Sequence, residues 1–216
     1  FDTGESTFSM GTMFRENRFT GPDRIGDTNQ LTVALTSRLI DAEGGDDLLK
    51  GTLGQIYYFE DRQVSLSTDP TVPQTFNRSD FVGELYTRLN SKFYMYNFFQ
   101  YDSEESEIGD FKTDLRYSKD ARRGVNVGYY YNNNGSQQLN ADVAWALAPR
   151  WQLNANARYD IEESDFLRSG LAIGYSACCW GVTVAAQRRI DNQSEYVNSF
   201  LLTFTLNGLT NIKTGF

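Results

Sequence analysis

Apolar and polar residues alternate along most of the chain with a period of two. In the stretch RWQLNANARYDI (150–161), Trp151, Leu153 and Ala155 share one face, whereas Gln152 and Asn154 lie on the other. Only an extended strand sorts side chains onto two faces in this way. The same alternation recurs in eleven segments, at 29–40, 50–61, 80–90, 92–102, 110–118, 123–132, 137–148, 150–161, 166–177, 179–190 and 196–208. The pattern therefore predicts an all-β chain.

The length of these segments favours a membrane. Most are near ten residues long, whereas strands of globular proteins run about 5–6 residues and tilted membrane-crossing strands about 9–11. Aromatic residues gather towards the segment ends, where interfacial girdles lie, at Trp145, Trp151, Tyr159, Tyr175 and Trp180. We therefore expect an antiparallel transmembrane β-barrel. The facing of 50–61 and 92–102 stays open, because apolar residues occupy both of their faces.

The links between segments predict the orientation of the chain. Short links at 89–92, 118–123, 147–150 and 177–179 alternate with polar, often longer links at 61–79, 102–110, 132–136, 162–165 and 191–195. Outer-membrane barrels alternate short periplasmic turns with longer extracellular loops. We accordingly expect an extracellular loop at 1–28, barrel strands within 29–208 and a periplasmic tail at 209–216. The link 41–47 fits this alternation less well.

Eleven strands would leave the two chain ends on opposite sides of the membrane, whereas single-chain bacterial barrels have an even number of strands. Either 6–14 (STFSMGTMF) is a twelfth strand, or the chain is the C-terminal portion of a larger barrel. We favour the second explanation, because 6–14 alternates poorly.

Composition excludes several classes of function. The mean hydropathy is −0.50, and neither an apolar run near 20 residues nor a signal peptide is visible. A net charge of −8 disfavours nucleic-acid binding. The absence of histidine removes the commonest general base and zinc ligand. The acidic link 102–110 lacks the spacing of a calcium loop, and Glu162 with Glu163 implies no pocket. We predict no enzyme activity, no metal and no cofactor.

Two groups of polar residues are candidate functional residues. Polar residues on the inward faces of the strands are expected to line a hydrated lumen: Lys112, Asp114, Arg116, Asn126, Asn140, Asp142, Asn154, Asn156, Arg158 and Arg168. A packed loop that closes the extracellular mouth is expected from turn-forming and oppositely charged residues: Arg15, Arg18, Pro22, Asp23, Arg24 and Asp27. Direct binding of phosphates by these loop arginines is the less favoured alternative.

Five stretches together resemble the C-terminal half of the LptD family of lipopolysaccharide (LPS) assembly proteins. They are RENRFTGPDRIGDTNQLTVALTSR (15–38), GQIYYFEDR (54–62), RRGVNVGYYY (122–131), YSACCWGVTVAAQRR (175–189) and FTLNGL (204–209). The resemblance implies a much larger barrel in the outer membrane of a Gram-negative bacterium, preceded by a periplasmic jellyroll. It also implies that LPS enters the outer leaflet through a lateral gate between the first and last barrel strands.

The resemblance also implies roles for particular residues and partners. Cys178 and Cys179, the only cysteines, would form disulfides with upstream cysteines of the periplasmic region. The last strand would form one side of the gate through Phe200, Leu202, Phe204 and Leu206. Implied partners are LPS, an LptE-type plug lipoprotein, an LptA-type periplasmic bridge reached through the N-terminal domain, and the barrel-assembly machinery.

Two other functions compete with LPS transport. A general diffusion porin is the main alternative, although it offers no use for the paired cysteines. An outer-membrane hydrolase is the weaker alternative, because such enzymes depend on a histidine in a triad or an Asp-His pair.

Overall fold

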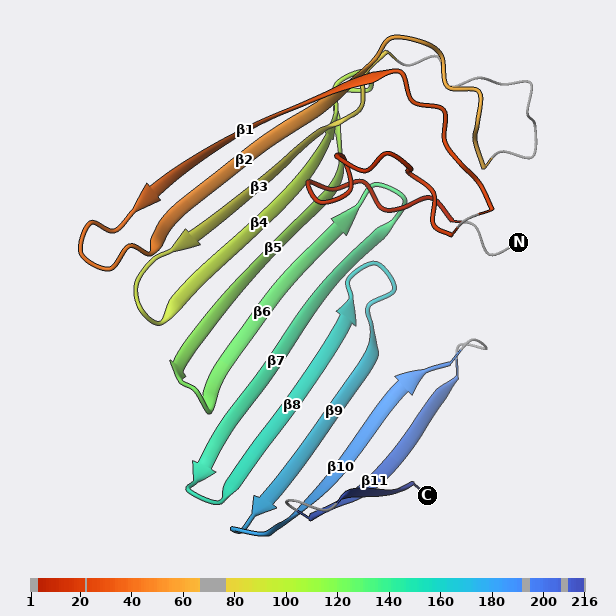
Figure 1. The fold of residues 1–216 in the computed structure, drawn as a ribbon. Helices are drawn as coiled ribbons and strands as arrows, with labels where there is room; N and C mark the ends of the chain where they lie inside the picture. Colours follow the sequence, from red (N-terminus) through yellow and green to blue (C-terminus); the bar gives the residue numbers. More distant parts are fainter. Residues whose placement is uncertain (1–3, 22, 67–76, 192–194, 207–209, 216) are drawn as a thin grey trace. The chain divides into compact units, whose positions relative to one another are not determined.

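The structure is a computed structural model that describes residues 4–21, 23–66, 77–191, 195–206 and 210–215. In these residues it has twelve strands, and strands adjacent in the chain are adjacent in one sheet (Figure 1). They are β1 (Gln30–Ile40), β2 (Asp47–Tyr58), β3 (Phe81–Arg88), β4 (Phe93–Asp102), β5 (Glu107–Asp120), β6 (Arg123–Asn132), β7 (Ser136–Ala148), β8 (Trp151–Asp160), β9 (Asp165–Ser176), β10 (Trp180–Ile190), β11 (Tyr196–Leu206) and β12 (Thr210–Gly215). None of the described residues forms a helix long and apolar enough to cross a membrane. The predicted all-β fold is confirmed.

The chain divides into two compact units. Unit 1 comprises Phe1–Thr87 and Tyr96–Phe111, and unit 2 comprises Arg88–Met95 and Lys112–Phe216. Unit 1 thus contains β1, β2, β3 except its last residue, most of β4 and the start of β5. Unit 2 contains the first residues of β4, the rest of β5 and the strands that follow.

The strands β6 to β11 of unit 2 pair in continuous antiparallel registers that keep apolar and polar rows apart. One row across the six strands consists of Val125, Val143, Ala155, Leu171, Ala186 and Phe200. The adjacent row, which points to the opposite side, consists of Asn126, Asp142, Asn156, Gly170, Gln187 and Ser199. We call these sides the apolar face and the polar face of unit 2. Leu171 and Phe200 are 57% and 64% exposed, as expected of side chains that face lipid.

Aromatic rings mark both ends of the apolar face. Near the β7–β8 and β9–β10 turns, the ring centroids of Trp151 and Tyr175 are 5.1 Å apart, those of Tyr175 and Trp180 are 5.5 Å apart, and those of Trp180 and Phe204 are 6.3 Å apart. At the other end of β8, Tyr159 meets Phe166 at 5.1 Å. Trp151 and Tyr159 are eight residues apart on β8, which is about 26 Å along a strand. The two clusters therefore match a pair of girdles around an apolar band.

In unit 1 the loop before β1 packs on one side of the sheet. Met13 is 1% exposed and lies against Gly54 of β2, where an added Cβ would be only 2.7 Å from Met13 Cε. The Thr32 hydroxyl donates a hydrogen bond to the Met13 carbonyl oxygen (3.3 Å). Ile56, which is 5% exposed, lines the same pocket as Met13.

The register in unit 1 establishes the facing of β2 and β4. Leu53 pairs with Leu35, which is 76% exposed, whereas the neighbouring Gly54 lies under the loop. Leu53 therefore belongs to the exposed side and Ile56 to the covered side. An added Cβ at Gly83, the partner of Leu53, would collide with the Phe99 ring, which places Phe99 of β4 on the exposed side. The face of β2 that carries Gly54 lies under the loop, so both faces of β2 can be apolar.

A twelfth strand is present, but not at 6–14, the position that the sequence analysis disfavoured. Residues 6–14 form no strand, and the loop has only an isolated bridge between Glu5 and Phe19. Instead β12 pairs antiparallel with Leu201–Leu206, so the expected tail at 209–216 contains a strand. The stretch Thr210–Gly215 is short and has a single large apolar residue, so only pairing with the edge of β11 makes it a strand. The bounds of two other strands also differ: β2 starts at Asp47 and β5 spans Glu107–Asp120.

Candidate functional site

The polar face of unit 2 contains a hollow of about 800 Å³ between β5 and β10. Six of the ten residues predicted to line a lumen lie on its wall: Asp114, Arg116, Asn126, Asp142, Asn154 and Asn156. The other four are Lys112, Asn140, Arg158 and Arg168. Asn140, Arg158 and Arg168 are successive register partners on the same face. Lys112 forms an ion pair with Asp114, with 3.1 Å between Nζ and Oδ2, which places both side chains on this face.

Small residues create the hollow, and reasoning from polar positions missed them. An added Cβ at Gly170 would lie 2.4 Å from Asn156 Oδ1, so a larger residue would displace that amide. Ala144, Ala172 and Ala185 also lie on the wall. The sequence signal was the series Gly170, Ala172 and Gly174 at alternate positions of β9. Alternate residues share one face of a strand, so small residues there leave that face without bulky side chains.

The two cysteines occupy the tight β9–β10 turn, which the backbone hydrogen bond from Ala177 N to Trp180 O closes at 2.8 Å. Both cysteines are exposed, and their Sγ atoms are 3.0 Å apart, well beyond the length of a disulfide, about 2.05 Å. The hydrogen bond with Cys178 raises the pKa of the Cys179 thiol, and burial adds to the shift. In the chain as it stands, both sulfur atoms are accessible to another cysteine.

The predicted gate residues lie on β11, but β11 is not the last strand. Phe200, Leu202 and Phe204 are exposed on the apolar face, while Leu206 is half-buried opposite Trp180. Strand β12 pairs with Leu201–Leu206 only. Within the described residues, Tyr196–Phe200 has no partner on the β12 side, so half of this edge stays open.

The predicted mouth-loop residues are joined mainly to the stretch after β2. Arg18 forms ion pairs with Glu5 (3.3 Å) and Asp27 (3.6 Å), and it donates a hydrogen bond to the Val64 carbonyl oxygen. Arg24 donates to the Ser65 carbonyl oxygen, and both guanidinium groups lie over the Phe19 ring. Arg15 and Asp23 are exposed, and Pro22 lies outside the described residues. The predicted pairing of opposite charges is therefore found between Arg18 and Asp27.

Asp27 is the electrostatic link in this loop. Burial acts to raise the pKa of its carboxyl group, but hydrogen bonds from backbone N–H groups, including those of Gln63 and Val64, and the positive charge of Arg18 outweigh that effect. The net result is a pKa below the ordinary value of 3.8. The charged form of Asp27 therefore holds residues 63 and 64 against the loop.

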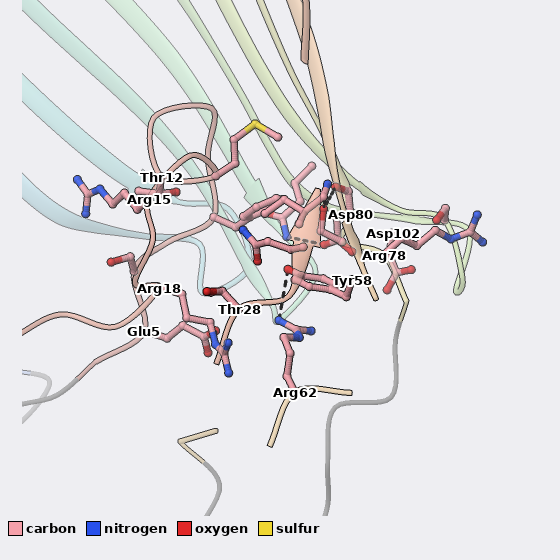
Figure 2. A pocket seen from close by; sticks show the side chains of 18 of the residues that line it. Glu5, Thr12, Arg15, Arg18, Thr28, Tyr58, Arg62, Arg78, Asp80 and Asp102 are labelled. Atoms are coloured by element: carbon pink, nitrogen blue, oxygen red, sulfur yellow. Dashed lines mark hydrogen bonds and ion pairs between the residues drawn. The ribbon is translucent and has the colours of Figure 1, made fainter. Parts of the chain in front are cut away.

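A pocket of about 350 Å³ lies between this loop and the covered side of the unit 1 sheet (Figure 2). Arg62 stacks on the Tyr58 ring at 4.1 Å from its centroid, and the Gln100 amide donates to Asp80. Figure 2 shows Glu5 and Arg18 on the loop side of the pocket and Asp80 on the sheet side. Four arginines and four carboxylates line this pocket, so it carries no strong net charge.

Comparison with known proteins finds one family. The model of the family described as LptD, LPS transport system D, matches residues 1–151. The LPS-assembly protein LptD of Alkalilimnicola ehrlichii is 34% identical over 225 residues, which cover 100% of this chain and 29% of that protein. The protein of the same name from Burkholderia ambifaria is 32% identical, and the alignment covers 100% of this chain and 29% of that protein. The one from Azoarcus sp. is 31% identical, and the alignment covers 98% of this chain and 27% of that protein. The chain thus spans less than a third of the length of these relatives.

Proposed function

The chain belongs to the LptD family, and on that premise we propose that it is the C-terminal part of an outer-membrane barrel that inserts LPS into the outer leaflet of a Gram-negative bacterium. The observation that carries the proposal is the match of the family model to residues 1–151. The sheet supports it, because an exposed apolar face opposite a polar hollow suits a wall between lipid and a hydrated lumen.

The alternation of links supports an orientation in the membrane. The β5–β6, β7–β8 and β9–β10 turns lie at one end of the strands, since neighbouring strands are antiparallel, and all three are short. We assign this end to the periplasm and the loop at 4–28 to the cell exterior, where it closes the mouth of the barrel.

This orientation gives Cys178 and Cys179 a use. The β9–β10 turn would lie in the oxidising periplasm, and its two exposed sulfur atoms would form disulfides with cysteines upstream of this chain. Since adjacent residues are poorly placed to bond each other, two separate bridges to the periplasmic region are the arrangement we propose. They would fix the barrel to the domain that receives LPS.

The lateral gate is assigned to the C-terminal strands. Phe200, Leu202 and Phe204 of β11 present apolar side chains to lipid, and the half of the β11 edge beyond β12 offers unpaired backbone groups to the first strand of the complete barrel. A short pairing is easier to part than a full-length one, which suits a gate. The barrel-assembly machinery would recognise the same edge of β11.

The polar hollow is assigned to the lumen. Its amides and charges would solvate the lumen and contact an LptE-type plug lipoprotein, while LPS would arrive over an LptA-type bridge through the N-terminal domain. A diffusion porin would also have a polar hollow, but it leaves the cysteine turn without a role.

The test of the proposed function uses the full-length protein in cells that depend on it. Cys178→Ser with Cys179→Ser is expected to slow maturation and to reduce LPS at the cell surface severalfold, whereas Ala177→Ser in the same turn should have no effect. Disulfide mapping by mass spectrometry without reduction should find both cysteines bonded to upstream cysteines. Normal LPS display in the double variant would refute the role of the cysteines and favour a porin.

The gate is tested separately. A cysteine at Phe200, cross-linked to one on the first strand of the complete barrel, should block LPS export, and reduction of the cross-link should restore it. A cysteine at Val184, which is exposed on the apolar face in the interior of the sheet, serves as the control. Export that continues with the cross-link in place would remove the gate from this strand.

A further inference from the structure

Three arginines form one row on the polar face of unit 2. Arg158 of β8 is the register partner of Arg168 of β9, and Arg168 is the partner of Arg189 of β10. Directly opposed residues in an antiparallel sheet have Cα atoms about 4.5–5.5 Å apart. All three side chains are exposed, so three guanidinium groups project together into solvent.

The partners of this arginine row are neutral. Arg158 Nε donates a hydrogen bond to Asn140 Oδ1 (2.9 Å), and Arg168 Nη2 donates to Gln187 Oε1 (3.5 Å). In the described part of the chain, none of the three arginines forms an ion pair with a carboxylate, in contrast to Arg38, which binds Asp47 through two hydrogen bonds of 2.8 Å. The positive charge of the row is therefore available to a ligand.

The arginine row is expected to lower the stability of the sheet, so a compensating function would explain its presence. Like charges directly opposite each other destabilise a sheet, and a chain with a net charge of −8 has no general excess of cations that would place them there by chance. The row also adjoins the hollow. Its three members are each two residues from a residue of the hollow wall, namely Asn156, Gly170 and Gln187, so the cationic row is the rim of a cavity.

We propose that the arginine row binds the phosphate groups of a phosphorylated saccharide, with the sugar in the hollow above Gly170. A phosphate monoester carries about −1.5 to −2 charges and three acceptor oxygens, and the planar guanidinium group binds such oxygens in pairs. A single carboxylate has one charge and two oxygens, which leaves most of the row uncompensated. The inference rests on the proposed function, because it makes LPS the source of the phosphorylated sugar.

The experiment uses the full-length protein with its plug lipoprotein in nanodiscs. Binding of purified LPS is compared with binding of the same LPS after enzymatic removal of its phosphates, and inorganic pyrophosphate is a competitor that lacks the sugar. Arg168→Gln and Arg189→Gln should each weaken binding of phosphorylated LPS about tenfold, with little change for the dephosphorylated form. Arg168→Lys should retain part of the affinity, since it keeps the charge but loses the planar fork.

The matched control is Arg188→Gln. Arg188 is the neighbour of Arg189, but it lies on the apolar face, with its guanidinium group 3.7 Å from the centroid of the Tyr196 ring. The Arg188→Gln substitution removes one positive charge from β10, as Arg189→Gln does, and should leave LPS binding unchanged. Resistance to unfolding in SDS at room temperature shows whether each variant has a folded barrel.

The outcomes separate the inference from the proposed function. If the unaltered protein binds no LPS, the proposed function fails. If the unaltered protein binds LPS, and the folded arginine variants bind phosphorylated and dephosphorylated LPS equally well, only the role of the arginine row is refuted. Loss of the plug lipoprotein from the row variants, with LPS binding intact, would make the row a protein contact and overturn the inference. Competition by pyrophosphate that the row variants abolish would show that phosphate alone is sufficient.

Discussion

Gly54 shows how one missing side chain positions the loop before β1. Met13 occupies the space where a Cβ of Gly54 would lie, and it lines the same pocket as the buried Ile56. The loop before β1 is thus held by packing at one point and by charge around Arg18 and Asp27 at another. The two anchors are predicted to respond to different perturbations.

The packing anchor should respond to volume. Gly54→Ala forces Met13 out of its place, and overpacking of this kind costs about 1–3 kcal/mol. We expect a lower thermal midpoint and faster protease cleavage within residues 4–28. Gly51→Ala on the same strand is the control, because its nearest neighbour, Leu85 Cδ1, is at an ordinary 3.6 Å. Equal cleavage of the two variants would show that Met13 does not hold the loop.

The charge anchor should respond to pH. Because the folded-state pKa of Asp27 is lowered, its stabilisation is present above the unfolded pKa, about 3.9, and is lost as the pH falls through the still lower folded value. Protection of the Gln63 and Val64 amides from hydrogen exchange should therefore decrease below about pH 4. In Asp27→Asn the decrease should already be present at pH 6, whereas Asp23→Asn should behave like the unaltered protein. Protection that is the same in Asp27→Asn at pH 6 would contradict the assignment.

At the scale of the element, strands β6 to β11 act as a partition between two environments. Each residue step reverses the face, and the registers keep this alternation aligned across all six strands. The aromatic rings at both ends and the aliphatic residues between them then follow from one repeated pattern, as a lipid-facing band requires.

Adjacent positions on β9 should therefore tolerate charge very differently. Leu171→Arg places a cation in the middle of the apolar face, where it costs about 2–4 kcal/mol in a bilayer. Ala172→Arg places it in the polar hollow, where the cost should be much smaller because the charge stays hydrated. Urea unfolding in phospholipid vesicles measures the difference. A similar loss of unfolding free energy in both variants would mean that the two faces do not contact lipid and water respectively.

At the scale of the whole molecule, apolar side chains are on the surface and not in a central core. Met13, Phe19, Ile56 and Val82 are the buried apolar residues of the described part, and all four belong to unit 1. Leucine, valine and phenylalanine side chains are exposed along β1, β9 and β11. Apolar surface of this extent needs lipid or another apolar partner.

The isolated chain of 216 residues should accordingly depend on an amphiphile. Refolded into detergent micelles, it should show β-sheet circular dichroism and a single species by light scattering. Dilution of the detergent below its critical micelle concentration should produce large aggregates within minutes. A monodisperse species without detergent would contradict a lipid-facing surface.

The sequence by itself determined eleven of the twelve strands, the faces of most of them and the family. The alternation in RWQLNANARYDI predicts β8 within one residue at each end, because a period of two is a local property that no distant contact is needed to read. The same local signal placed Asp114, Asn126 and Asn156 on the face that holds the hollow.

Only the tertiary structure decided what depends on residues far apart in the chain. Met13 covers Gly54, and this contact explains why β2 has apolar residues on both faces. Strand β12 forms because the edge of β11 supplies its hydrogen-bond partners. The six residues of β12 have too weak an alternation to predict this strand from sequence. The arginine row arises from the registers of three strands, since Arg158, Arg168 and Arg189 look unrelated until pairing brings them side by side. Alternation is encoded between neighbouring residues, whereas register and coverage are set by pairing across the sheet.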